Sequence, residues 1–131
     1  MLRKVLVFLN KGIRNIVYPV KDLAKSKAMF RNLLGIEPYV DSPFYVGFKF
    51  GDYEIGLDPN GHRAGVTVYF NVEDMKQTLD SLSEQGAKIQ QDVKEIGGGA
   101  ATAIVRDADG NLIGLLAPSP TTKPSSKPRI Q

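Results

Sequence analysis

Hydrophobic and polar positions follow one pattern twice between residues 13 and 117. In the first half, an apolar stretch at residues 13–20 predicts a strand, and a helical pattern follows it. Asp22 is suited to cap that helix and Gly35 to end it in a left-handed conformation. The apolar positions that share one face of this helix are Leu23, Phe30 and Leu34. Three short runs then predict strands at residues 36–41, 44–50 and 53–58.

The second half repeats this order. A strand is expected at residues 66–70, and the helix after Asp74 places Met75, Leu79 and Leu82 on one face and stops at Gly86. Three more strands are expected at residues 87–93, 100–106 and 111–117, with Asp109-Gly110 as the last hairpin turn. Each half therefore predicts a β-α-β-β-β module.

Matching residues support an internal duplication. Val-Lys-Asp at 20–22 and Val-Glu-Asp at 72–74 both stand where a strand leads into a helix, and Ile-Gly-Leu recurs at 55–57 and 113–115 in the last strand of each half. We expect one domain over residues 13–117, with module one at 13–60, module two at 61–117 and a pseudo-twofold relation between them. Residues 1–12 are interpreted as an N-terminal extension and 118–131 as a disordered tail rich in Pro, Ser, Thr and Lys.

Composition and charge exclude several classes. The chain of 131 residues fits one ordinary domain, and the lack of cysteine excludes disulfides, thiolate nucleophiles and Cys-based metal sites. The apolar run Val5 to Leu9 is too short for a secretory signal or a membrane span, so we expect a cytoplasmic protein and interpret this run as a strand or docking segment. Six of the 17 basic residues lie in the two ends, where no acid occurs. The remaining core has no basic excess, which argues against nucleic acid as a partner.

The duplicated pattern resembles the vicinal oxygen chelate superfamily, the group of glyoxalases, bleomycin-resistance proteins and extradiol dioxygenases. The resemblance covers residues 13–117 and depends most on Val-Lys-Asp-Leu at 20–23, Leu-Gly at 34–35 and Asp-Ala-Asp-Gly-Asn at 107–111. It implies an α+β fold in which tandem βαβββ modules form a curved mixed sheet around a central cavity.

Enzymes of that family bind a divalent metal through four ligands on the first and last strands of each half. The resemblance places those positions at Asn15, Gly56, Thr67 and Gly114, none of which is a usual ligand. Shifting each position by one residue finds no ligand either, and a shift of two reaches only Glu54 and Asp58 in a single strand. We therefore expect no metal and no other cofactor.

The remaining candidate chemistry lies near the lost ligands. In a regular strand, Glu54 and Asp58 lie on the same face as Gly56, so Glu54 is the weak candidate for acid-base catalysis, with a solvated strand-end acid as the alternative. Asn15, Thr67 and Tyr69 are expected to offer hydrogen bonds to a ligand. Gly56 and Gly114 lack side chains where the family has bulk, which is interpreted as volume for a ligand or as a decayed site.

Other candidates have simpler explanations. Phe44, Phe48 and Phe50 alternate onto one strand face, which predicts core packing, while Tyr45 points the other way. His62, the only histidine, is interpreted as an exposed linker residue. The three glycines at 97–99 lack the G-K-[ST] sequence of a phosphate loop and predict a mobile loop over the cavity mouth, with a plain bulge or turn as the alternative.

The resulting hypothesis is metal-independent binding of a small molecule in the sheet cavity by a protein like the bleomycin-resistance members. The alternative is a lyase, isomerase or dioxygenase that uses a displaced metal or acid-base chemistry through Glu54. A third class is an interaction module in which the N-terminal apolar run pairs with a partner chain. The expected partners are a small-molecule ligand and a second copy of this chain in a homodimer, without nucleic acid or membrane.

Overall fold

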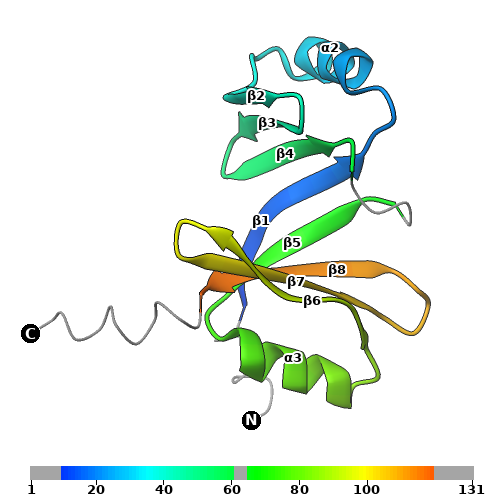
Figure 1. Ribbon diagram of the computed structural model, residues 1–131, viewed down its shortest axis with the longest axis vertical. Helices are drawn as coiled ribbons and strands as arrows, with labels where there is room; N and C mark the ends of the chain where they lie inside the picture. The colour runs from blue at the N-terminus through cyan, green and yellow to red at the C-terminus, as the bar shows by residue number, and fades with distance from the viewer. Residues whose placement is uncertain (1–9, 61–64, 120–131) are drawn as a thin grey trace, which may run out of the picture. The chain divides into compact units, whose positions relative to one another are not determined.

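The structure is a computed structural model that describes residues 10–60 and 65–119 (Figure 1). The expectations for the run Val5 to Leu9, for His62 and for the tail beyond Ser119 lie outside the described residues. The chain divides into two compact units, one at residues 13–69 and one that contains residues 70–119, and each is described by itself. The element order matches two β-α-β-β-β modules.

The first module contains one helix and four strands. They are β1 (Asn10–Pro19), α2 (Leu23–Leu34), β2 (Val40–Ser42), β3 (Tyr45–Phe50) and β4 (Tyr53–Asp58), and the strand order is β2-β3-β4-β1. β1 is parallel to β4, while β3 is antiparallel to both β2 and β4. The cap predictions for α2 are confirmed. Asp22 accepts a hydrogen bond from the Lys25 N–H at 3.1 Å, and Gly35 ends the helix at φ +71°.

The core of the first unit lies between α2 and one face of its strands. Val46, Phe48 and Leu57 are buried there and contact half-buried apolar side chains of α2 and its flanking segments. The prediction that Phe48 packs in the core is confirmed. For Phe44 and Phe50 the prediction is wrong. Phe44 lies in the turn before β3 with 72% of its surface exposed, and Phe50 at the end of β3 is 47% exposed.

The second module repeats the order with β5 (Thr67–Val72), α3 (Met75–Glu84), β6 (Lys88–Gly97), β7 (Ala100–Arg106) and β8 (Leu112–Pro118). Its strand order is β5-β8-β7-β6. The Asp74 side chain caps α3 by accepting from the Gln77 N–H at 3.0 Å. Met75, Leu79 and Leu82 pack from α3 against apolar residues of β7 and β8, as their shared face predicts.

Several strand boundaries differ from the predictions, most of all in β2 and β6. β1 begins at Asn10, inside the predicted N-terminal extension, and β8 ends at Pro118, the first residue of the predicted tail. β2 is shorter than the expected run at 36–41, because Ile36 packs against the core cluster and Pro38 has no N–H for a strand ladder. β6 is longer than expected and continues to Gly97, where three successive glycines with positive φ make the turn into β7. The alternative that residues 97–99 form a turn is therefore confirmed.

Within the described residues, two helices and eight strands with both parallel and antiparallel pairing confirm the predicted α+β class. Within the described part of the chain, neither helix is long and apolar enough to cross a membrane.

Candidate functional site

The free face of the first half-sheet, the face away from α2, carries two of the polar side chains predicted for the site, Asn15 and Glu54. Side chains alternate along a strand, and Ile55 and Leu57 of β4 pack on the α2 side. Glu54, Gly56 and Asp58 therefore lie on the free face, as predicted. Asn15 of β1 is the register partner of Glu54, so these two positions are neighbours in the sheet.

A pair of facing glycines shapes the centre of this face. Gly47 of β3 and Gly56 of β4 stand opposite one another in the antiparallel register. A Cβ atom built on Gly56 would overlap the hydroxyl of Tyr45 and lie 2.7 Å from its Cζ, and one on Gly47 would lie 3.1 Å from Tyr45 Cε2. The phenol ring of Tyr45 thus lies across the glycine pair. The space over Gly56, interpreted above as volume for a ligand, is occupied by the Tyr45 ring in this structure.

Tyr45 and Glu54 meet across the glycine pair. Tyr45 precedes Gly47 by two residues and Glu54 precedes Gly56 by two on the antiparallel neighbour, so the two Cα atoms lie about 13 Å apart along the strands. Only side chains that lean toward each other over bare backbone can close that distance. The Tyr45 hydroxyl donates to Glu54 Oε2, and the Tyr39 hydroxyl donates to Glu54 Oε1.

We call Asn15, Tyr39, Tyr45 and Glu54 the tyrosine–glutamate cluster. Burial, followed by the hydrogen bond to Glu54, raises the pKa of Tyr45, whereas the hydrogen bond with the Asn15 side chain lowers it. For the more exposed Tyr39, the hydrogen bond to Glu54 is the main cause that raises the pKa. Both phenols therefore remain protonated donors at neutral pH, and the carboxylate of Glu54 is their shared acceptor.

A cation lies beside the cluster. Lys49 of β3 stands opposite Glu54 in the register, and its Nζ lies 5.2 Å from the centroid of the Tyr39 ring. This distance is within the range of a cation–π contact. Together with Lys49, the cluster thus combines one carboxylate, two phenol donors, an amide and an ammonium group.

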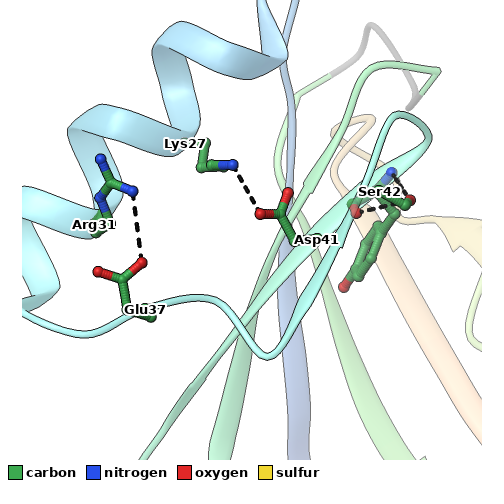
Figure 2. A network of polar contacts seen from close by, with 6 residues as sticks. Lys27, Arg31, Glu37, Asp41 and Ser42 are labelled. Carbon is green, nitrogen blue, oxygen red and sulfur yellow. Dashed lines mark hydrogen bonds and ion pairs between the residues drawn. The ribbon is translucent and has the colours of Figure 1, made fainter.

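Two ion pairs hold the segment that carries Tyr39 (Figure 2). Lys27 of α2 pairs with Asp41 at 2.8 Å and Arg31 with Glu37 at 3.5 Å, on either side of Tyr39 in the sequence. The Tyr39 N–H also donates to the Gly47 carbonyl at 2.9 Å. Beside the Lys27–Asp41 pair lies an open groove of about 480 Å³ lined by Leu23, Ala24, Lys27, Asp41, Ser42, Pro43 and Val46. The ion pairs and the backbone hydrogen bond thus connect the segment around Tyr39 to α2 and β3.

The other predicted site residues do not join the cluster. Thr67 is buried at the start of β5, and Tyr69 has a raised pKa because of burial and, next, the charge of Asp58. Gly114 lies on β8 in the other unit, opposite Ile104. The structure therefore brings together Asn15, Glu54 and Gly56.

Sequence reasoning missed Tyr39, Tyr45 and Lys49 as members or neighbours of the site. A usable signal existed for Tyr45, because Gly47 follows it by two residues on the same strand face and Gly56 lies on the next strand. Tyr39 gave no periodic signal, since it stands in the irregular segment before β2.

The residues at the family's four metal positions do not fit a metal. Two are glycines without a side-chain donor, and the space over Gly56 holds the Tyr45 phenol. Glu54, two residues away, already accepts a hydrogen bond on each carboxylate oxygen. Across residues 10–60 and 65–119, no three His, Cys, Asp or Glu side chains gather in a group that could hold a metal ion.

Comparison with known proteins agrees with this fold. The sequence model of the Glyoxalase/Bleomycin resistance protein/Dioxygenase superfamily matches residues 12–115. No curated protein matches the chain.

Solved structures with a fold similar to that of this chain include three differently named proteins. One is a superfamily member from Vibrio splendidus 12B01, with 19% identity, a TM-score of 0.65 and coverage of 81% of this chain and 98% of that chain. Another is methylmalonyl-CoA epimerase from Mycobacterium tuberculosis, with 18% identity, a TM-score of 0.60 and coverage of 88% and 93%. The third is the Mn(II)-bound glyoxalase from Novosphingobium aromaticivorans, with 18% identity, a TM-score of 0.63 and coverage of 83% and 39%. At these identities the likeness shows the fold alone.

Proposed function

The chain belongs to the glyoxalase/bleomycin resistance protein/dioxygenase superfamily, and we propose that it binds a small organic molecule at the tyrosine–glutamate cluster, without a metal at the family's four ligand positions. The observation that carries this proposal is the pair of phenols that donate to Glu54, of which Tyr45 does so across the Gly47–Gly56 backbone. Small-molecule sites typically combine a concave, mostly apolar surface with a few polar groups that point toward the ligand.

The cluster offers distinct contacts to a ligand. A carboxylate has about four acceptor positions, so Glu54 can accept from a ligand while it retains one or both phenol partners. The Tyr39 ring and the Asn15 amide add an aromatic surface and a second polar group. A ligand with an O–H or N–H donor and an apolar body matches this arrangement.

A ligand screen by thermal shift tests the proposal. The full chain and the Glu54→Gln variant are heated with divalent metals, thiol adducts, aromatic diols and glycopeptide antibiotics, each with and without a chelator. A ligand present at 100 times its Kd stabilises the wild type by about 2.7 kcal/mol. We expect an organic compound to do so in the presence of chelator, and Glu54→Gln to weaken the response at least fivefold.

The matched control is Glu84→Gln, which removes an exposed carboxylate at the end of α3. It should respond to the compound as the wild type does. Stabilisation by a divalent metal that chelator removes would contradict metal-independent binding and place the ligands elsewhere in the chain.

A second candidate is an enzyme of the lyase, isomerase or dioxygenase kind. Its support is the Glu54 carboxylate, which the Tyr39 and Tyr45 hydroxyls hold in place and which retains acceptor positions that can take a proton from a substrate. The expected result is that Glu54→Gln retains binding of an identified substrate and loses at least a hundredfold in kcat. Full turnover by that variant would remove this acid-base role.

The proposal includes three further expectations. We propose that residues 13–117 act as one domain, that the chain forms a homodimer and that it works in the cytoplasm. Sedimentation equilibrium of the full chain tests the dimer, with a single species of 14.3 kDa as the contradicting result.

A further inference from the structure

Tyr45 occupies a position in which every feature of a phenol has a partner. Its hydroxyl donates to Glu54 Oε2, and Asn15 is the register partner of Glu54 on the neighbouring strand. Its ring lies over Gly47 and Gly56, where a Cβ on either residue would touch it. We call this position the phenol slot. A carboxylate acceptor, a neighbouring amide and a floor without side chains together suit a hydroxylated aromatic ring.

The occupant of the phenol slot is not part of the apolar core. The buried cluster of the first unit contains Val46, Phe48 and Leu57, which flank Tyr45 in sequence or register but lie on the α2 side. Tyr45 is half-buried, and its two side-chain torsions can move the ring without breaking the β3–β4 ladder. The ring is therefore held in the slot mainly by polar contacts at its tip.

From this geometry we infer that the phenol slot is a ligand subsite in which the Tyr45 ring is a displaceable occupant, and that the ligand carries a free hydroxyl on a single aromatic ring. This inference rests on the proposed function and names its ligand class. In the bound state the hydroxyl of the ligand donates to Glu54 Oε2 and faces Asn15, while Tyr39 keeps its hydrogen bond to Oε1. The ring of the ligand lies on the glycine pair in place of Tyr45.

Competition with Tyr45 sets the affinity. A ligand that binds only when the slot is empty has an apparent affinity reduced by the fraction of molecules in which Tyr45 has left. Removal of the Tyr45 ring should therefore strengthen binding, which is the opposite of what truncating an ordinary contact residue does. This change of sign separates a displaceable occupant from a wall of the site.

The test uses p-cresol, which reproduces the tyrosine side chain, and toluene, which lacks only the hydroxyl. Binding to the full chain is measured by calorimetric titration for the wild type, Tyr45→Ala and the double variant Tyr45→Ala with Gly56→Ala. We expect Tyr45→Ala to bind p-cresol at least tenfold more tightly than the wild type and at least tenfold more tightly than toluene. Gly56→Ala should cancel this gain, because its Cβ lies where the phenol tip would sit.

Three results would overturn the inference. They are a Tyr45→Ala variant with no gain in affinity, equal binding of p-cresol and toluene, and a gain that survives Gly56→Ala. If Tyr45→Ala does not fold, Tyr45→Phe replaces it, since this variant keeps the ring and loses the hydroxyl that donates to Glu54. We then expect a gain for p-cresol of about threefold, and an unchanged or weaker affinity overturns the inference.

Failure of the phenol class and failure of the proposed function give different results. If p-cresol fails while another organic compound stabilises the wild type and depends on Glu54, the site binds small molecules of another class. If no compound in the screen depends on Glu54 and p-cresol also fails, both proposals are wrong.

Discussion

The two halves of the chain share a register but differ in the chemistry of one sheet face. In the first half Gly56 faces Gly47, whereas in the second half Gly114 faces Ile104, which is only 1% exposed. Both pairs lie on the face away from the helix of their own half, because their strand neighbours pack against that helix. The same scaffold thus presents bare backbone in one half and a buried aliphatic side chain in the other.

The neighbouring positions differ in the same way. Two residues before Gly56 stands Glu54, and two residues before Gly114 stands Leu112. The place of Tyr45 is taken in the second half by Thr102, two residues before Ile104. The comparison teaches that the internal duplication preserves strand pairing and capping, while the polar cluster belongs to the first half. Substitutions that exchange or remove these residues can test that division.

The largest effect on stability is expected from truncating Ile104, the buried side chain that lies opposite Gly114 in the second half. Ile104→Ala removes most of a fully buried side chain, so the free energy of unfolding should fall by about 2–5 kcal/mol in urea denaturation. The control is Ile89→Ala on β6, where the side chain is half exposed and the expected change is within about 1 kcal/mol. Equal losses in both variants would contradict the assignment of Ile104 to a packed interior.

A smaller effect on stability is expected from adding a Cβ atom to either glycine of the facing pair in the first half. Gly56→Ala places a Cβ against the Tyr45 hydroxyl, and Gly47→Ala places one 3.1 Å from Tyr45 Cε2 and from Glu54 Oε2. We expect Gly56→Ala to cost about 1–3 kcal/mol and to expel the ring from Glu54, with a smaller cost for Gly47→Ala. Tyrosine ring signals in NMR spectra report the expulsion. An unmoved Tyr45 ring in Gly56→Ala would refute the close approach.

Loss of a single phenol hydroxyl should follow in size. Tyr45→Phe removes a half-buried hydrogen bond to a carboxylate, which predicts a loss of about 1–2 kcal/mol. Tyr39→Phe should cost less than about 1 kcal/mol, because Tyr39 is 53% exposed. Urea denaturation at neutral pH checks the order of the two losses, and the opposite order would contradict the burial difference.

The raised pKa of Tyr45 also predicts how the free energy of unfolding changes at alkaline pH. Because the pKa of Tyr45 in the folded chain is raised above the ordinary value of 10.0, the folded state holds a proton that the unfolded state releases. The stabilisation from this group is complete below about pH 10 and declines as the pH rises further. Unfolding curves of the wild type and Tyr45→Phe should therefore converge at alkaline pH. A constant difference between them up to pH 11 would contradict the raised pKa.

The smallest effect is expected at the ion pair between α2 and the segment before β3. Lys27 and Asp41 are partly exposed, so Asp41→Asn should lower the free energy of unfolding by about 0.2–1 kcal/mol at low salt. The difference should shrink at 1 M salt because the charges are screened. A loss that is unaffected by salt would show that the Asp41 side chain acts through something other than its charge.

Much of the fold could be predicted from the sequence because its signals are local. Asp22 and Asp74 cap their helices through contacts three residues away, and Gly35 ends α2 through its own backbone conformation. Strand alternation also placed Glu54 and Gly56 on one face. Such features depend on period and on neighbours in the chain, which a sequence displays directly.

The centre of the site could not be predicted in the same way. A strand pattern states which face a side chain leaves, but not that Tyr45 leans along the strand over Gly47 and Gly56 to reach Glu54. That contact depends on the register between β3 and β4, which fixes what lies opposite each glycine. Tyr39 depends on the irregular segment after α2, where no period applies. The sequence therefore does not reveal that the Tyr45 ring lies over Gly56.

The most direct test of metal-free binding in the first half is a two-dimensional amide NMR titration of the full chain, in chelator, with the organic compound that stabilises it most. We expect the largest shifts at Gly47, Gly56 and the Asn15 side-chain amide, with small shifts around Gly114. Shifts confined to the second half, or a titration that chelator abolishes, would contradict the assignment of the site to the tyrosine–glutamate cluster.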